Sequence, residues 1–247
     1  MRADTADTWL AGVDGCPAGW VVAFVRPDGG EARIRIVPRF AGVLSAPETP
    51  AVVAVDMPVG LPDRTGHGGR AAENAVRPLL GARQSSVFSV PARAAIEAAE
   101  YREACRLALA TSDPPRKVSK QLFNLTPKIR EVDQAVRADA AAVKRVFEVH
   151  PELAFWRLNG ERPLTEPKKV KGRPHEPGLA MRRRLLIAAG LAAATVNAAP
   201  PKGAGADDLL DALACAAIAR RIHAGAAEPF PNPPPVDAFG LRMAIWA

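Results

Sequence analysis

Two apolar segments of the sequence each end in an aspartate that directly precedes a turn. Asp14 lies in "AGVDGCPAGW" and Asp56 in "AVVAVDMPVGLP", and both preceding runs have the length and composition of a buried strand. Strands that point the same way end at one edge of a sheet, and binding sites collect there. Two carboxylates at such an edge repel each other unless a positive group lies between them, and Mg²⁺ or Mn²⁺ is the usual one. The alternative is that each aspartate caps the turn that follows it.

A third segment, "DDLLDALACAAIARR", places further aspartates on a predicted helix over residues 207–225. Asp208 and Asp211 are spaced i, i+3 and Asp207 and Asp211 i, i+4, so either pair shares one helix face. We expect Asp207 at the N-cap and Asp208 in the first turn, where the helix dipole favours negative charge. Asp211 lies a full turn further along, beside "ALACAA", and a carboxylate among apolar neighbours is costly unless it is paired or binds a metal.

Glu148, in "VFEVHPE", is the fifth acidic candidate. On a strand it would share one face with Val146 and His150. His150 has two interpretations, as a metal ligand or acid/base group and as a structural histidine beside a proline.

Composition and charge favour a globular protein with an anionic partner. Of the 247 residues, 48% are hydrophobic and 24% charged, which is ordinary for a globular protein and allows one domain over 8–247. The net charge is +7, which favours anionic partners such as nucleic acid, nucleotides or acidic membranes. An overall composition rich in Arg and Ala would give the same charge without such a partner. Residues 167–184 concentrate this charge, with seven Lys or Arg and one Glu. The alternative is that this basic run is solvated surface.

The three cysteines, Cys16, Cys105 and Cys215, lack CxxC spacing. This argues against a disulfide framework or a zinc ribbon and favours the reducing cytoplasm. We see no signal peptide at the N-terminus. The longest apolar stretch, residues 185–199, is Ala-rich and interrupted by Gly190, which suits a buried helix better than a membrane span.

The pattern along the chain predicts a mixed α/β fold with one sheet. Strands are expected at 8–14, 20–26 and 32–38 as an antiparallel meander, then at 51–56 and 144–155, with a short strand in the C-terminal tail. Helices are expected at 39–46, 70–81, 94–110, within 118–143, at 179–196 and at 207–225. Residues 61–140 would form a mainly helical insert and 159–178 a basic connection.

These features together resemble the ribonuclease H-like superfamily, in which a three-strand meander, a fourth strand ending in an acid and a late acidic helix recur. The stretch "DDLLDALACA" resembles the late helix of RuvC-type Holliday junction resolvases. More closely, the chain resembles a family of predicted nucleases known as domain of unknown function 429. The stretches that carry this resemblance span about residues 10–220 and are "GVDGCPAGW", "AVDMPVGLP", "GARQSSVFSVPAR", "SKQLFNLTPKIREVD", "FEVHPELAF" and "DDLLDALACA".

The resemblance implies a ribonuclease H-like mixed sheet with flanking helices, and a nuclease that hydrolyses phosphodiester bonds with two Mg²⁺ or Mn²⁺ ions. It places Asp14, Asp56, Asp208 and Asp211 at the catalytic and metal-binding positions. Many such enzymes carry a glutamate at or near the place of Asp56, and Glu148 is the candidate substitute. Within the insert, the residues expected to contact substrate phosphates are Arg83, Ser86, Lys120, Gln121, Lys128 and Arg130.

Two other classes of function stay open at this point. An ATP-using phosphotransferase or ATPase of the actin-like fold would use Asp14 and the turn "GCPAG" on phosphates, although such proteins usually duplicate the fold. A catalytically inactive module would bind nucleic acid or nucleotide without metal. The sequence does not distinguish DNA from RNA and leaves the oligomeric state open.

Overall fold

The computed structural model describes residues 7–247, and its centre is a seven-stranded sheet. The strand order is β3-β2-β1-β4-β5-β9-β8. The strands are β1 (Leu10–Cys16), β2 (Gly19–Val25), β3 (Ala32–Val37), β4 (Val52–Val55), β5 (Val146–Glu148), β8 (Pro229–Phe230) and β9 (Ile245–Trp246). β1, β2 and β3 pair antiparallel, whereas β1, β4, β5 and β9 pair parallel. The predicted mixed α/β fold, with a three-strand meander beside parallel strands, is therefore confirmed and is compatible with a ribonuclease H-like fold.

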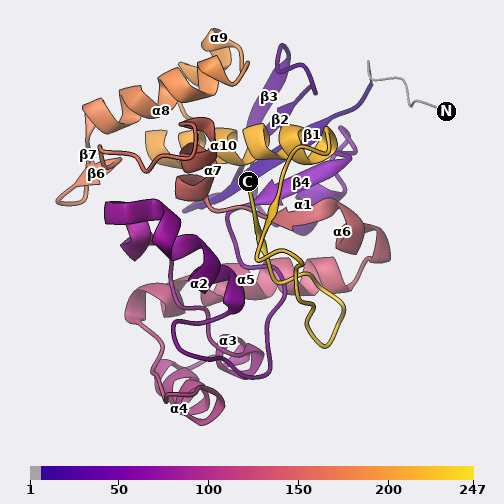
Figure 1. The fold of residues 1–247 in the computed structure, drawn as a ribbon. Coiled ribbons are helices and arrows are strands. Elements are labelled where there is room, and N and C mark those ends of the chain that lie inside the picture. Colours follow the sequence, from indigo (N-terminus) through magenta and orange to yellow (C-terminus); the bar gives the residue numbers. More distant parts are fainter. Residues whose placement is uncertain (1–6) are drawn as a thin grey trace.

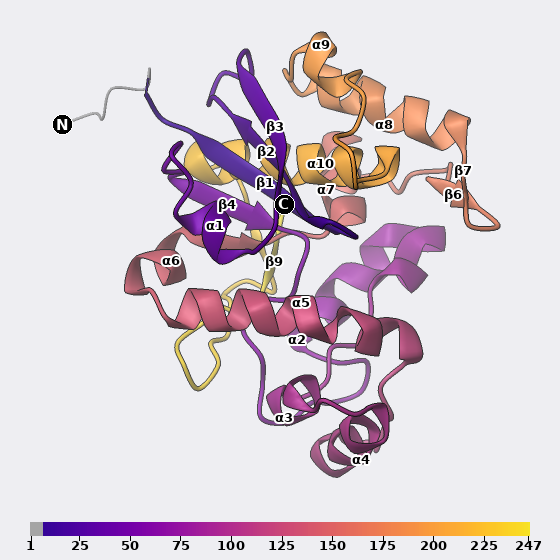
Figure 2. The same ribbon diagram turned by 180° about the vertical axis from the view of Figure 1, so that it is seen from behind.

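Helices cover both faces of the sheet (Figures 1 and 2). They are α1 (Ala41–Leu44), α2 (Ala71–Val76), the 3₁₀ segment η1 (Arg77–Ser86), α3 (Arg93–Glu97), α4 (Tyr101–Thr111), α5 (Lys120–Arg137), α6 (Ala140–Arg145), α7 (Pro151–Leu158), α8 (Glu176–Ala188), α9 (Ala193–Val196) and α10 (Ala206–His223). Within residues 7–247, every helix is too short or too polar to cross a membrane.

Alternation along the strands divides the apolar core into two layers. Ala11 and Val13 of β1 face a cluster that includes α1, α4 and α5, whereas Leu10 and Cys16 face α7, α8 and α10. α10 lies directly on β1, because a Cβ on Gly12 would come within 2.1 Å of backbone atoms of Ala212 and Ala216. Glycine at this position lets the helix approach the strand closely.

The expected insert is mostly helical and comprises α2, η1, α3, α4 and α5. Both views place these elements together below the sheet, with α8 and α9 above it (Figures 1 and 2). Long-range contacts break the predicted helix over 94–110 into α3 and α4. Ala98 is extended, and the Arg130 guanidinium on α5 donates to the carbonyl oxygens of Ile96, Glu97 and Ala98. This contact ends α3 without a Gly or Pro in the sequence to signal it.

Two other predicted elements need correction. The strand predicted over 144–155 is only the three residues of β5, because α6 extends to Arg145 and Pro151 begins α7. Proline suits the first turn of a helix, where its missing N–H costs nothing. The helix predicted over 179–196 is interrupted at Gly190, whose φ of +89° ends α8 before α9 begins.

A two-stranded hairpin, β6 (Lys169–Val170) and β7 (Arg173–Pro174), lies within the basic connection. The two strands are exposed. The hairpin brings Lys168 and Lys169 to α10.

Candidate functional site

Asp14 and Asp56 are held side by side by the parallel pairing of β1 and β4. The last paired residues are Val13 and Val55, and the Asp56 N–H donates to the Val13 carbonyl at 2.9 Å. Asp14 and Asp56 are the next residues along the two chains, so their Cα atoms lie about one strand spacing (~4.8 Å) apart. The predicted convergence of these two carboxylates at one sheet edge follows from this register.

α10 adds a third carboxylate. Asp14 shares the face of β1 that carries Gly12, and Asp211 directly precedes the α10 residue that crosses Gly12. Asp211 is only 2% exposed, and its Oδ1 atom is buried without a hydrogen-bond partner in the described chain. Buried polar atoms are normally hydrogen-bonded, so this oxygen points to a ligand that protein atoms do not supply.

The positive charge among these carboxylates belongs to Lys168. Its Nζ contacts Asp211 Oδ2, and its charge also acts on Asp14 and Asp56. Across residues 7–247 no three His, Cys, Asp or Glu side chains are grouped so that they could hold a metal ion as they stand. Lys168 therefore stands among the carboxylates, the place predicted for a divalent cation.

Full ionisation of this cluster is unfavourable because of burial and because its carboxylates repel one another. Burial raises the pKa of Asp14 well above its usual range, and the charges of Asp56 and Asp211 raise it further. Burial raises the pKa of Asp56 and of Asp211 to about 6 each, against the lowering effect of Lys168. Burial lowers the pKa of Lys168, but the three carboxylates outweigh it and keep that pKa above its ordinary value.

The first turn of α10 holds the other two aspartates of the motif. The predicted N-cap, Asp207, is wrong: Gly205 is the N-cap, and its N–H donates to Asp208 Oδ2 at 2.8 Å. Asp207 instead forms an ion pair with Lys169 at 2.6 Å. Asp208 is close enough to Asp14 to raise its pKa, so it lies at the border of the cluster and also acts as a capping residue.

Glu148 belongs to a different network. Its carboxylate accepts hydrogen bonds from Arg70 at 2.6 and 3.0 Å and from the Val59 N–H at 2.8 Å. Arg70 also pairs with Glu73 at 2.6 Å, and all three charged side chains are buried. These contacts position the loop after β4, and the catalytic role of Glu148 stays a prediction.

Sequence reasoning missed Glu152, which lies on α7. One oxygen accepts from the buried Arg182 at 2.5 Å, and the other, Oε2, is buried without a partner in the part of the chain described here. Its charge raises the pKa of Asp56 and of Asp211. In the sequence, the only indication of Glu152 was its place within "EVHPE". The strand predicted over these residues gave Glu152 no role.

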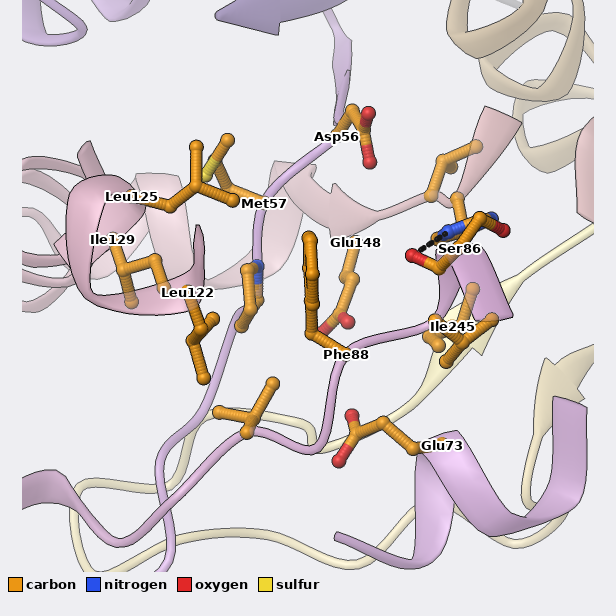
Figure 3. A pocket seen from close by; sticks show the side chains of 15 residues that line it. Asp56, Met57, Glu73, Ser86, Phe88, Leu122, Leu125, Ile129, Glu148 and Ile245 are labelled. Atoms are coloured by element: carbon orange, nitrogen blue, oxygen red, sulfur yellow. Dashed lines mark hydrogen bonds between the residues drawn. The ribbon is translucent and has the colours of Figure 1, made fainter. Parts of the chain in front are cut away.

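A cavity of about 120 Å³ opens beside Asp56 (Figure 3). Asp56 lies at one end and Glu73 at the other, with Phe88 and Glu148 between them. Its apolar wall comprises Met57, Pro58, Val87, Val90, Leu122, Leu125, Ile129, Val149 and Ile245. The cavity is smaller than the dry cavity of about 150 Å³ that accommodates benzene, and its ends carry the carboxyl groups of Asp56 and Glu73.

Lys128 packs against β1 at the residue after Asp14. Its Nζ donates to the Gly19 carbonyl at 2.6 Å, and its stem lies against Gly15, directly after Asp14. Lys120 lies over the Tyr101 ring. Arg130 is occupied by the three carbonyl oxygens at the end of α3.

Two of the three remaining predicted contacts, Ser86 and Gln121, line cavities. Ser86 lines the cavity that holds Asp56, and its hydroxyl donates to the Arg83 carbonyl at 2.8 Å. Gln121 is exposed and lines a second, larger cleft. The Nε atom of Arg83 is buried without a partner among the described residues.

The matching family agrees with the resemblance seen in the sequence. The family described as "Protein of unknown function (DUF429)" matches residues 12–236, a span that runs from β1 to beyond α10. The chain belongs to the DUF429 family. No curated protein and no solved structure matches it. The family match covers the three aspartates of the cluster and Lys168.

The raised aspartate pKa values predict how the stability of the DUF429 protein changes with pH. A carboxyl group whose pKa is near 6 when folded and about 3.9 when unfolded contributes stability below pH ~4 that is lost as the pH rises through 6. For Asp211 the two-unit difference corresponds to up to about 3 kcal/mol.

With EDTA present, the free energy of unfolding of the wild type should therefore fall between pH 4 and 7 relative to Asp211→Asn. Asp63→Asn removes an exposed aspartate, so its free energy of unfolding should change with pH as that of the wild type does. Parallel curves for the wild type and Asp211→Asn would contradict the raised pKa.

Proposed function

We propose that the DUF429 protein is a metal-dependent nuclease that hydrolyses phosphodiester bonds at the cluster of Asp14, Asp56 and Asp211. The observation that carries this proposal is the meeting of three carboxylates from β1, β4 and α10. Asp14 and Asp211 are buried, Asp56 is half-buried, and Asp211 Oδ1 has no hydrogen-bond partner among the described residues. Carboxylate oxygens are the ligands that Mg²⁺ and Mn²⁺ prefer. Bound there, these ions lower the pKa of a water molecule and stabilise the leaving oxygen.

The residues of this chain would divide the remaining work. Asp14, Asp56 and Asp211 would hold the ions, with Asp208 at the border. Lys168 now neutralises Asp211, and it would move away to leave both carboxylate oxygens free. Lys128, which packs against Gly15, would contact a substrate phosphate.

The direct test is cleavage of labelled DNA and RNA in single-stranded, duplex and junction forms, with Mg²⁺, Mn²⁺ or EDTA. Cleavage of at least one substrate with either metal, and none with EDTA, is the expected result. ATP hydrolysis without cleavage of any nucleic acid would replace this proposal with a phosphotransferase or ATPase.

Metal binding should also stabilise the folded protein. An ion present at about a hundred times its Kd contributes about 2.7 kcal/mol, which raises the Tm of a chain of this size by about 5–11 °C. We expect this rise for the wild type and for Asp63→Asn, and its loss in Asp14→Asn, measured by thermal unfolding. In EDTA, Asp14→Asn should melt at or above the wild-type temperature, because one repulsive charge is removed. A metal response that persists in Asp14→Asn would indicate that this aspartate only caps a turn.

Lys168 favours a second candidate, an inactive module that binds nucleic acid without metal. A permanent Lys168–Asp211 pair would make a cation unnecessary. In that case the wild type would bind nucleic acid equally well in EDTA and in Mg²⁺, would cleave nothing and would show no metal-dependent rise in Tm. Lys168→Met would then create a metal response that the wild type lacks.

A further inference from the structure

A basic cleft of about 660 Å³ lies next to the cavity that holds Asp56. Its walls come from the segment 67–89 and from the residues around the start of α5. Three cationic side chains line it, Arg77, Arg116 and Lys117, together with His67, and no Asp or Glu is among its lining residues in the described chain. A cleft with this charge attracts an anion.

Two of the three cations are free to bind a ligand. Arg116 and Lys117 are exposed, and neither has an ion-pair partner within residues 7–247. Arg77 is held in place by Val87, Asn74 and Ser89 at 3.0–3.2 Å. Burial lowers the pKa of Arg77, and the charge of Arg116 lowers it further against the opposing effect of Glu73. Arg77 and Arg116 therefore repel each other, and an anion between them would relieve that repulsion.

The basic cleft also adjoins the acidic cluster. Val87 and Phe88 line both the basic cleft and the Asp56 cavity, so one short wall separates the two spaces. Phe88 is half-buried and offers an aromatic ring at this boundary (Figure 3). Positively charged grooves that carry aromatic rings bind single-stranded nucleic acid, because the rings stack on unpaired bases.

We propose that the basic cleft binds a short single-stranded segment of nucleic acid, with phosphates on Arg77, Arg116 and Lys117 and an unpaired base against Phe88. This inference rests on the proposed function and names its substrate class. The cleft has the size of a site for one small ligand, so it admits one or two nucleotides of a strand and excludes a duplex. The strand then continues past Phe88 towards Asp56.

The test is equilibrium binding without metal. A labelled oligonucleotide of about 12 nucleotides, within the range that one single-strand-binding fold covers, is titrated in EDTA as a single strand and as a duplex, with fluorescence anisotropy as the readout. The variant is Arg116→Gln/Lys117→Gln. Its matched control is Arg39→Gln/Lys144→Gln, which removes two exposed cations, one before α1 and one on α6.

We expect the wild type to bind the single strand more tightly than the duplex. The cleft variant should lose at least about tenfold in affinity at low salt, and its slope of log K against log salt should fall by about 1.4, or 0.7 for each of two phosphate contacts. The control should behave like the wild type. Phe88→Leu should weaken single-strand binding by about fivefold or more without changing the slope, once thermal unfolding shows that it is folded.

Equal losses in the cleft variant and the control would overturn the proposal, as would equal affinity for duplex and single strand. Because binding is measured without metal, this result is independent of cleavage. Cleft-dependent binding without any metal-dependent cleavage would support the cleft and refute the nuclease. If the cleft variant cleaves nucleic acid at the wild-type rate, the result would support the nuclease and refute the cleft.

Discussion

Asp14→Asn and Asp211→Asn should each lower metal-dependent cleavage by about 10³-fold or more. A metal ion supplies several kcal/mol of charge stabilisation in the transition state, and each 1.36 kcal/mol is tenfold in rate. Asparagine keeps the size of the side chain but removes the negative charge that holds the ion. Asp14 and Asp211 are both buried in the cluster, so neighbouring water cannot replace them readily. Initial rates with Mn²⁺ and with Mg²⁺ on the best substrate of the cleavage panel give the measurement.

Asp63→Asn is the matched control, since it makes the same chemical change at an exposed position. It should cleave at the wild-type rate. Thermal unfolding of each variant in EDTA excludes misfolding as the cause of lost activity. Wild-type rates in folded Asp14→Asn and Asp211→Asn would show that the cluster is structural, with Lys168 as its permanent counter-ion.

The central strands and the meeting of Asp14 with Asp56 follow from local sequence patterns. Apolar runs of strand length marked β1 and β4, and each run ended in its aspartate. Parallel pairing then places both carboxylates at one edge, whatever the rest of the chain does. Asp211 was predictable for a similar reason, because its apolar neighbours on α10 require the helix to be buried on all sides.

Lys168 and the break between α3 and α4 could not be predicted in the same way, because distant contacts decide them. Lys168 lies in a basic connection whose sequence suits solvent as well as a site, and only the folded chain brings it to Asp211. The break at Ala98 depends on Arg130, more than thirty residues away in the chain. In the sequence, neither Lys168 nor Arg130 differs in its local pattern from the residues beside it.

The strand predicted for Glu148 is correct, but the strand alone did not determine the role of this residue. The sequence placed it on a strand, and the structure shows that this strand, β5, pairs with β4. Its partner Arg70 is far away in the chain, so the ion pair could not be read from the pattern. The spacing of Arg70 and Glu73 was a local hint, since residues at i and i+3 can contact each other at a helix start, and the Arg70 N–H donates to Glu73 Oε2 at 2.6 Å.

Arg70→Met should therefore destabilise the DUF429 protein by about 3–5 kcal/mol. The substitution leaves the carboxylates of Glu73 and Glu148 buried without their cation, and removing one partner of a buried ion pair has costs of this size. The corresponding loss in Tm is about 6–20 °C. Arg106→Met is the matched control, because it breaks an exposed i, i+3 pair with Glu103, and exposed ion pairs contribute little to stability.

The deficit of Arg70→Met should also grow with pH. Burial raises the pKa of Glu148 to about 7 even though Arg70 lowers it, so without Arg70 that pKa rises further. A carboxyl group with a raised pKa in the folded state costs stability as the pH rises through that pKa. Urea unfolding at pH 5 and pH 8 measures this growth. Equal, small losses for Arg70→Met and Arg106→Met at both pH values would show that the ionised form of Glu148 does not depend on Arg70.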